Sequence, residues 1–168
     1  RNGTIDEGLG KLYSILNTTT PETNIYHRET LLYTALAEGR LNNKPAKGLQ
    51  LLYTYLGKTP ETKTVQYLMA NLMIADGNND GAITVLSKSV GAPGAAAIPF
   101  LDFMLGECKL FRGDTDADMP LKKFLAEHKG KHFIKEAHQK LAWFALLKGD
   151  RSGYYNHMQQ ILIKGANT

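Results

Sequence analysis

Short polar turns recur along this chain, and their spacing limits the fold more than any other feature. In four places an apolar stretch ends in glycine followed by polar residues. These glycines are Gly39, Gly77, Gly113 and Gly149, spaced 38, 36 and 36 residues apart. Glycine reaches the left-handed conformation that ends a helix at little steric cost, and a following Asn, Asp or Ser can cap the next helix. The spacing predicts a repeat of helical hairpins.

Apolar residues recur at helical spacing on both sides of each turn. Before Gly77 they are Val65, Leu68, Met69, Leu72 and Met73, and after it they are Ile83, Val85, Leu86 and Val90. The same layout predicts hairpins at 23–57, 62–90, 97–128 and 132–164, preceded by a half-unit at 4–16. No alternating strand pattern competes. We expect one all-α domain of nine helices over residues 1–168, with 91–95 as a bend between pairs of hairpins.

Composition narrows the class of protein without choosing a function. Apolar residues make up 43% and charged residues 21% of the 168 positions, which predicts order nearly throughout. One cysteine, Cys108, excludes an internal disulfide and a Cys-based zinc cluster. No apolar run approaches the roughly 20 residues of a membrane span. The chain begins without methionine, so we interpret it as a piece of a longer protein. Its compartment stays open between the cytoplasm and, after signal-peptide removal, the bacterial cell envelope.

Charge is distributed unevenly along the chain. Residues 1–120 carry 11 Lys/Arg against 13 Asp/Glu, whereas residues 121–168 carry 9 against 3. A solvated basic face is the simplest explanation, and an acidic partner or an anionic surface are the alternatives.

The stretch 67–86 resembles a tetratricopeptide repeat (TPR). It has a small residue in mid-helix (Ala70), glycine at the turn (Gly77), alanine early in the second helix (Ala82) and a large apolar residue four positions later (Leu86). Gly106 and Ala142 occupy the mid-helix position in later units, whereas Leu32 stands there in the first. The resemblance spans 23–164, is similar to that of many bacterial TPR proteins, and implies an α-α superhelix, a right-handed solenoid of hairpins.

The resemblance also implies a binding groove lined by the first helix of each hairpin. Groove positions counted back from each turn glycine are Glu29, Tyr33, Tyr67, Asn71, Phe103, Glu107, Gln139 and Trp143. Aromatic rings supply rigid contact area, and Glu, Gln and Asn supply hydrogen bonds, as a peptide groove requires. For Phe103 and Trp143, packing between hairpins is an equal alternative.

Three clusters of polar residues invite a metal site, and each has a simpler explanation. Asp76, Asn78 and Asp80 resemble half of a calcium loop, but Ser87 stands where the bidentate Glu belongs. Asp114, Asp116 and Asp118 are better explained as helix caps.

The third cluster contains His128, His132, Glu136 and His138. Gly130 is expected to end a helix between the first two, so we expect neutral, exposed histidines and no metal or cofactor. No catalytic triad or phosphate loop can be assembled. The sequence therefore predicts a non-enzymatic scaffold that binds a protein or peptide. The alternative is an RNA-binding repeat that uses the basic C-terminal hairpin, which the acidic balance of residues 1–120 disfavours.

Overall fold

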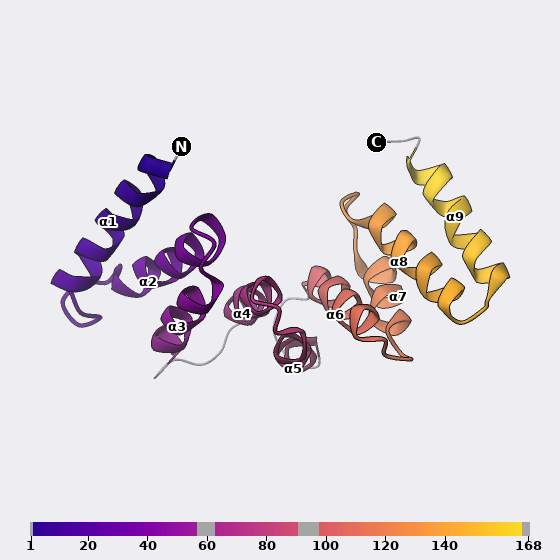
Figure 1. Ribbon diagram of the computed structural model, residues 1–168, viewed down its shortest axis with the longest axis horizontal. Helices are drawn as coiled ribbons and strands as arrows, with labels where there is room; N and C mark the ends of the chain where they lie inside the picture. Colours follow the sequence, from indigo (N-terminus) through magenta and orange to yellow (C-terminus); the bar gives the residue numbers. More distant parts are fainter. Residues whose placement is uncertain (1, 57–62, 91–97, 166–168) are drawn as a thin grey trace. The chain divides into compact units, whose positions relative to one another are not determined.

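The computed structural model describes residues 2–56, 63–90 and 98–165, and every regular element in these ranges is a helix. The elements are α1 (Asn2–Thr18), α2 (His27–Leu36), the π-helix η1 (Ala37–Leu41), α3 (Pro45–Leu56), α4 (Lys63–Ala75), α5 (Asn79–Val90), α6 (Pro99–Arg112), α7 (Asp118–Glu127), α8 (Ile134–Leu147) and α9 (Arg151–Gly165) (Figure 1). The all-α prediction is confirmed. The expected bend at 91–95 lies outside the described residues.

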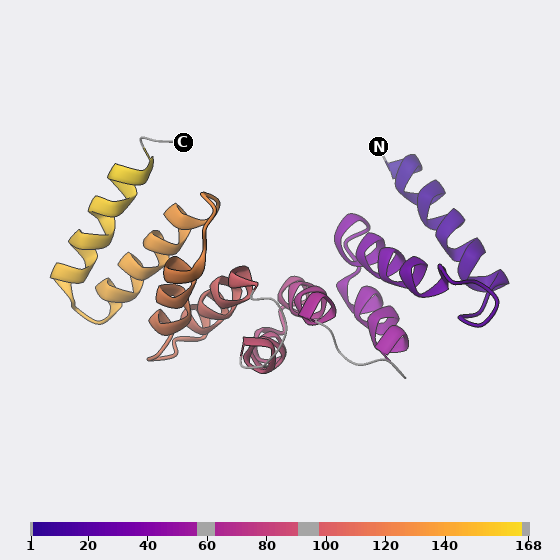
Figure 2. The ribbon, with the colours of Figure 1, turned by 180° about the vertical axis from the view of Figure 1, so that it is seen from behind.

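The chain forms two compact units, an N-terminal unit of residues 1–85 and a C-terminal unit of residues 86–168. In the N-terminal unit α1 packs against α2, α2 against α3, and α3 against α4. In the C-terminal unit α6 pairs with α7 and α8 with α9, while α8 also contacts α6 and α7. Figure 2 shows the α8–α9 hairpin from behind, its two helices running in opposite directions.

Three of the four predicted glycine turns have the same geometry. Gly77, Gly113 and Gly149 have positive φ of 77°, 86° and 74°. The residue after each glycine donates its N–H to a carbonyl five positions earlier, at 2.8–2.9 Å. This is the Schellman arrangement, in which a left-handed residue closes the helix end. Asn78 and Asp150 then accept the N–H of Gly81 and Gly153, each at 2.9 Å, as helix caps.

The first turn corrects the sequence prediction. Gly39 is buried inside η1, and the positive φ of 54° belongs to Asn43. A Cβ at Gly39 would overlap the side chain of Leu72 on α4, so this glycine serves close packing between helices. Gly48 is equally confined, because its Cβ would lie 2.6 Å from the carbonyl oxygen of Ala35. The helix therefore continues past Gly39 before it turns.

Small residues are buried at helix contacts in both units. Ala70 and Ala82 are fully buried, and Leu86 is fully buried four residues after Ala82. At Gly106 an added Cβ would lie 2.5 Å from Cγ of Leu121, so α6 and α7 approach closely there. The small positions singled out by the resemblance, Ala70, Ala82 and Gly106, are therefore all buried.

One buried charge joins α1, η1 and α3. Glu38 of η1 is 2% exposed and accepts hydrogen bonds from Tyr13 Oη at 2.7 Å, Asn42 Nδ2 at 2.8 Å and Lys47 Nζ at 2.5 Å. Lys47 also lies 4.8 Å from the ring centroid of Tyr13. Burial alone would raise the pKa of the Glu38 carboxyl, but these three donors outweigh it and lower the pKa to about 2. The carboxylate is therefore satisfied and ionised at neutral pH.

Candidate peptide-binding groove

Two helices of the C-terminal unit, α6 and α8, form the walls of the candidate site. The ring of Phe100 lies 4.7 Å from that of Phe133, and Glu107 Oε1 lies 2.6 Å from Lys140 Nζ. Both pairs join residues 33 positions apart. Helices α6 and α8 therefore run parallel and in register along this contact.

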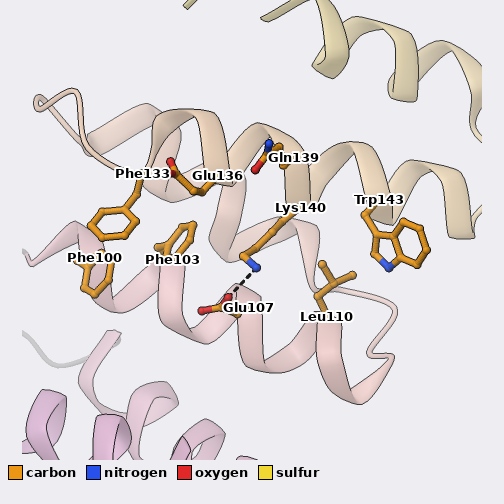
Figure 3. A pocket seen from close by; sticks show the side chains of 9 residues that line it. All are labelled: Phe100, Phe103, Glu107, Leu110, Phe133, Glu136, Gln139, Lys140 and Trp143. Atoms are coloured by element: carbon orange, nitrogen blue, oxygen red, sulfur yellow. Dashed lines mark ion pairs between the residues drawn. The ribbon is translucent and has the colours of Figure 1, made fainter. Parts of the chain in front are cut away.

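A pocket of about 440 Å³ opens between these walls. Its lining residues are Phe100, Phe103, Glu107 and Leu110 from α6, with Phe133, Glu136, Gln139, Lys140 and Trp143 on and just before α8 (Figure 3). Four of the eight residues predicted for the groove, namely Phe103, Glu107, Gln139 and Trp143, thus line one hollow.

Aromatic rings form one end of the pocket. Phe100, Phe103 and Phe133 have ring centroids 4.7–5.5 Å apart. Phe103 is only 4% exposed and packs in the core cluster with Phe124 and Leu121. It therefore serves the core and the pocket floor together. Phe133, which is 42% exposed, presents its ring at the surface.

Polar groups occupy the middle of the pocket, and Trp143 lies at the other end (Figure 3). The side chain of Lys140 is 28% exposed, and its Nζ pairs with the Glu107 carboxylate while lying 6.0 Å from the Phe103 ring centroid. Gln139 and Glu136 are exposed beside this pair. Trp143 exposes 55% of its surface, which makes it a large apolar group available for contact.

The other four predicted groove residues lie in the N-terminal unit. Glu29 and Tyr33 are exposed on α2, and Tyr67 and Asn71 are half-buried on α4. Each pair is one turn apart and so shares a helix face.

The later first turn shifts the register of the first hairpin. Counting from Asn43 and allowing for the extra residue of η1, the positions equivalent to Tyr67 and Asn71 are Leu32 and Leu36, both half-buried on α2. They follow Glu29 and Tyr33 by three residues each and extend the same helical stripe.

Sequence reasoning missed five pocket residues, namely Phe100, Leu110, Phe133, Glu136 and Lys140. Phe100, Leu110 and Glu136 each lie three residues from a predicted position, on the same helix face. A stripe of positions i, i+3, i+7 and i+10 on each first helix would have found them. Phe133 has φ 64° and precedes α8, so helical periodicity could not place it.

The histidine prediction is wrong for two of the three residues. His138 is 7% exposed, and its Nδ1 lies 3.1 Å from Nδ1 of His157 on α9. His128 follows α7 and stacks on Phe124 with ring centroids 4.7 Å apart. Both are held by aromatic packing, and only His132 is exposed as expected. Within the described ranges, no three His, Cys, Asp or Glu residues are grouped to hold a metal ion.

The capping prediction for three aspartates is also wrong. The N-cap of α7 is Ala117, and no side chain caps it. Instead Asp114 pairs with Arg112, Asp116 with Lys109, and Asp118 with Lys122, at 2.5–2.6 Å. Each carboxylate has a lysine or arginine within reach, and such charge-assisted hydrogen bonds are stronger than those between neutral groups.

The chain is similar to known proteins in fold but not in sequence. No protein-family model and no curated protein matches the sequence. A crystal structure of MamA superposes with a TM-score of 0.83 at 16% identity, covering 99% of this chain and 91% of that one. MamA from Desulfovibrio magneticus RS-1 gives 0.80 at 16% identity, covering 100% and 89%.

A third similar structure carries the family name directly. YrrB, described as a TPR protein with an unusual peptide-binding site, superposes with a TM-score of 0.74 at 12% identity, covering 96% of this chain and 78% of that one. None of the described helices is both long and apolar enough to cross a membrane. The stacked hairpins, the repeated turn geometry and these superpositions together show that the chain has the α-α solenoid fold of tetratricopeptide-repeat proteins.

Proposed function

We propose that the chain is a non-enzymatic scaffold that captures a peptide or protein segment in the groove between α6 and α8. The observation that carries the proposal is the pocket of about 440 Å³, where an exposed Trp143 and a packed aromatic floor flank a polar centre. Rigid aromatic area next to a few hydrogen-bonding groups is the composition of protein-binding hot spots. The peptide-binding site of the similar protein YrrB supports this choice.

The cysteine of the C-terminal unit is better suited to packing than to nucleophilic catalysis, which favours a scaffold. Cys108, next to the pocket residue Glu107, is 2% exposed. Burial, with a smaller contribution from the Glu107 charge, raises the pKa of its thiol to about 11. The thiol is protonated at neutral pH and therefore a weak nucleophile. Cys108 serves the core.

Nucleic acid fits the pocket less well than a peptide. Two carboxylates, Glu107 and Glu136, line it together with one amine, Lys140, which is already paired. Phosphate backbones require unpaired cations along the path of the strand. Salt-dependent binding of single-stranded RNA, lost when the exposed Lys131 and Lys135 are changed to Ala, would favour the RNA alternative.

The test is selection of binding peptides from a displayed random library on the intact chain. Trp143→Ala should weaken the selected peptides at least about tenfold, because a half-exposed indole at the pocket end is a large anchor. Tyr155→Ala is the matched control, since Tyr155 is a 65% exposed aromatic on α9, outside the pocket. Equal losses from both changes, or no loss from Trp143→Ala, would contradict the proposal.

We further propose that Tyr67 and Asn71, on one face of α4 in the N-terminal unit, contact the partner. Truncation of Tyr67 and Asn71 together should leave the helical circular dichroism signal intact and weaken capture of the partner. A double variant that unfolds would show that these residues serve the core.

A further inference from the structure

The residues that line the pocket recur at helical spacing on both of its walls. On α6 the lining residues are Phe100, Phe103, Glu107 and Leu110, and along α8 they begin at Phe133 and end at Trp143. The first and last residues of each stripe are ten positions apart, which corresponds to about 15 Å along a helix. Because α6 and α8 are parallel and in register, the hollow follows both axes and is a short straight groove.

Apolar surface lies at the two ends of this groove and charge lies between them. The stripe on α6 runs from Phe100 to Leu110. Its apolar residues on either side of Glu107, namely Phe103 on the pocket floor and Leu110, are seven residues apart, a rise of about 10.5 Å. The Glu107–Lys140 ion pair lies between these ends (Figure 3). An occupant therefore needs two bulky apolar groups about 10 Å apart, with a polar group between them.

We propose that this occupant is an amphipathic helical segment of a partner protein, with bulky apolar residues at positions i and i+7 and a Lys or Arg at i+3 or i+4. The inference rests on the proposed function of the groove. A helix bound along α6 and α8 has the same rise per residue as they have. Two apolar side chains two turns apart on it can therefore contact the apolar residues on both sides of the ion pair. Its residues at i+3 and i+4 face the polar centre.

Charge selects a basic residue at the centre of the segment. The Glu107 carboxylate is neutralised by Lys140 at 2.6 Å, whereas Glu136 is exposed one turn before Lys140 on α8. The pocket residues together carry one net negative charge. A cation from the ligand can pair with Glu136, whereas a carboxylate at the same position would be repelled by Glu136 and would compete with Glu107 for Lys140.

The experiment measures fluorescence anisotropy of labelled alanine-rich peptides of about 16 residues, long enough to populate a helix. The probe carries Phe at i, Leu at i+7 and Lys at i+4. One comparison peptide moves the second anchor to i+5, which places it about 140° around the helix, and another replaces Lys with Glu. The probe should bind at least about tenfold more tightly than the shifted peptide and about fivefold more tightly than the Glu peptide at low salt.

Variants of the intact chain locate the binding. Trp143→Ala should weaken the probe at least about tenfold and Tyr155→Ala should not. Glu136→Gln should reduce the preference for Lys over Glu, whereas Glu127→Gln, at the exposed end of α7, should leave that preference unchanged.

Four outcomes overturn the inference. Equal binding of the shifted peptide rules out the two-turn spacing, and a preference for Lys that survives Glu136→Gln rules out the assigned carboxylate. In another outcome the helical probe does not bind, and library peptides bind in an extended conformation and depend on Trp143. That outcome overturns this inference and leaves the proposed function intact. Failure of Trp143→Ala to weaken either kind of peptide overturns both.

Discussion

Replacement of Glu38 by Gln isolates the contribution of the buried charge that joins α1, η1 and α3. The substitution keeps the shape of the side chain and removes its charge. The amide keeps one acceptor oxygen, which can still accept from Tyr13 and Lys47, the two donors of Oε1, through weaker hydrogen bonds than a carboxylate makes. Its NH2 group replaces Oε2 and cannot accept from Asn42 Nδ2. Lys47, whose side chain is 46% exposed, can turn to water. The variant should therefore fold, with lower stability.

The size of the loss follows from the pKa of Glu38. The pKa falls from an ordinary value of 4.5 to about 2 in the folded chain, and each pKa unit corresponds to 1.36 kcal/mol between the protonation states. The charged form therefore contributes about 3 kcal/mol to the free energy of unfolding at pH 7. Because the folded pKa is the lower one, this contribution is present above pH 4.5 and is lost as the pH falls toward about 2.

Urea unfolding followed by circular dichroism at pH 7, 5, 4 and 3 measures both effects. At pH 7 the Glu38→Gln variant should be less stable by about 3 kcal/mol. The difference from the parent chain should shrink below pH 4.5, because Glu38 of the unfolded parent then binds a proton while the folded parent still keeps its carboxylate charged. Glu7→Gln is the matched control, since Glu7 is 68% exposed and paired with Lys11, and it should cost less than about 0.5 kcal/mol. A loss at pH 7 no larger than that control, or a difference that does not change with pH, would refute the reasoning.

Three further predictions concern packing and pH. Gly106→Leu should lower the free energy of unfolding by about 1–3 kcal/mol through overlap with Leu121, and Lys135→Ala should do little; an unmoved melting transition would contradict this contact. Gly39→Ala should cost about 1–3 kcal/mol through overlap with the side chain of the buried Leu72, measured by urea unfolding, whereas a neutral effect would contradict the packing role. Burial, helped by the Lys122 charge and opposed by Asp150, lowers the pKa of His157, so the folded state binds fewer protons and stability should fall as the pH drops through about 6.5. His157→Gln should flatten this dependence in a pH series of melting temperatures.

The sequence predicted the hairpins because their turns and packing rely on local rules. Gly77, Gly113 and Gly149 end helices in the left-handed conformation that glycine favours. The helical spacing of apolar residues then identifies which side of each helix faces the core. These signals are local and need no knowledge of the neighbouring helices. The fold class could therefore be predicted from the sequence.

The candidate groove could be predicted only in part. Counting back from the turn glycines identified the pocket residues Trp143, Gln139 and Glu107. It succeeded there because, in a regular helix, a groove residue lies a constant number of residues before the turn. It could not decide whether Phe103 serves the core or the pocket, since that depends on how deeply α7 and α8 cover the ring. Phe133 escaped for another reason. It precedes α8 at positive φ, outside the periodicity of the helix.

The burial of Glu38 could not be predicted because it depends on a single extra residue in η1. At the other three turns the closing hydrogen bond spans five residues, as from Asn78 N–H to Met73 O, but from Lys44 N–H to Glu38 O it spans six. With Asn43 as the turn residue, the distance to Gly77 is 34 positions, whereas counting from Gly39 gives 38.

The same extra residue explains why the first hairpin matched the repeat pattern poorly. A π-turn adds one residue to a helix and rotates all that precede it. Counted with that residue, the mid-helix small position falls on Ala35, which is fully buried, and not on Leu32. Gly48 follows Asn43 by five residues, as Ala82 follows Gly77, and both are buried. The insertion also places Glu38 in the interior, where Tyr13 and its two other donors keep the carboxylate ionised. Apolar periodicity assumes an unbroken 3.6-residue turn, so it assigns this side chain to the wrong side of the helix.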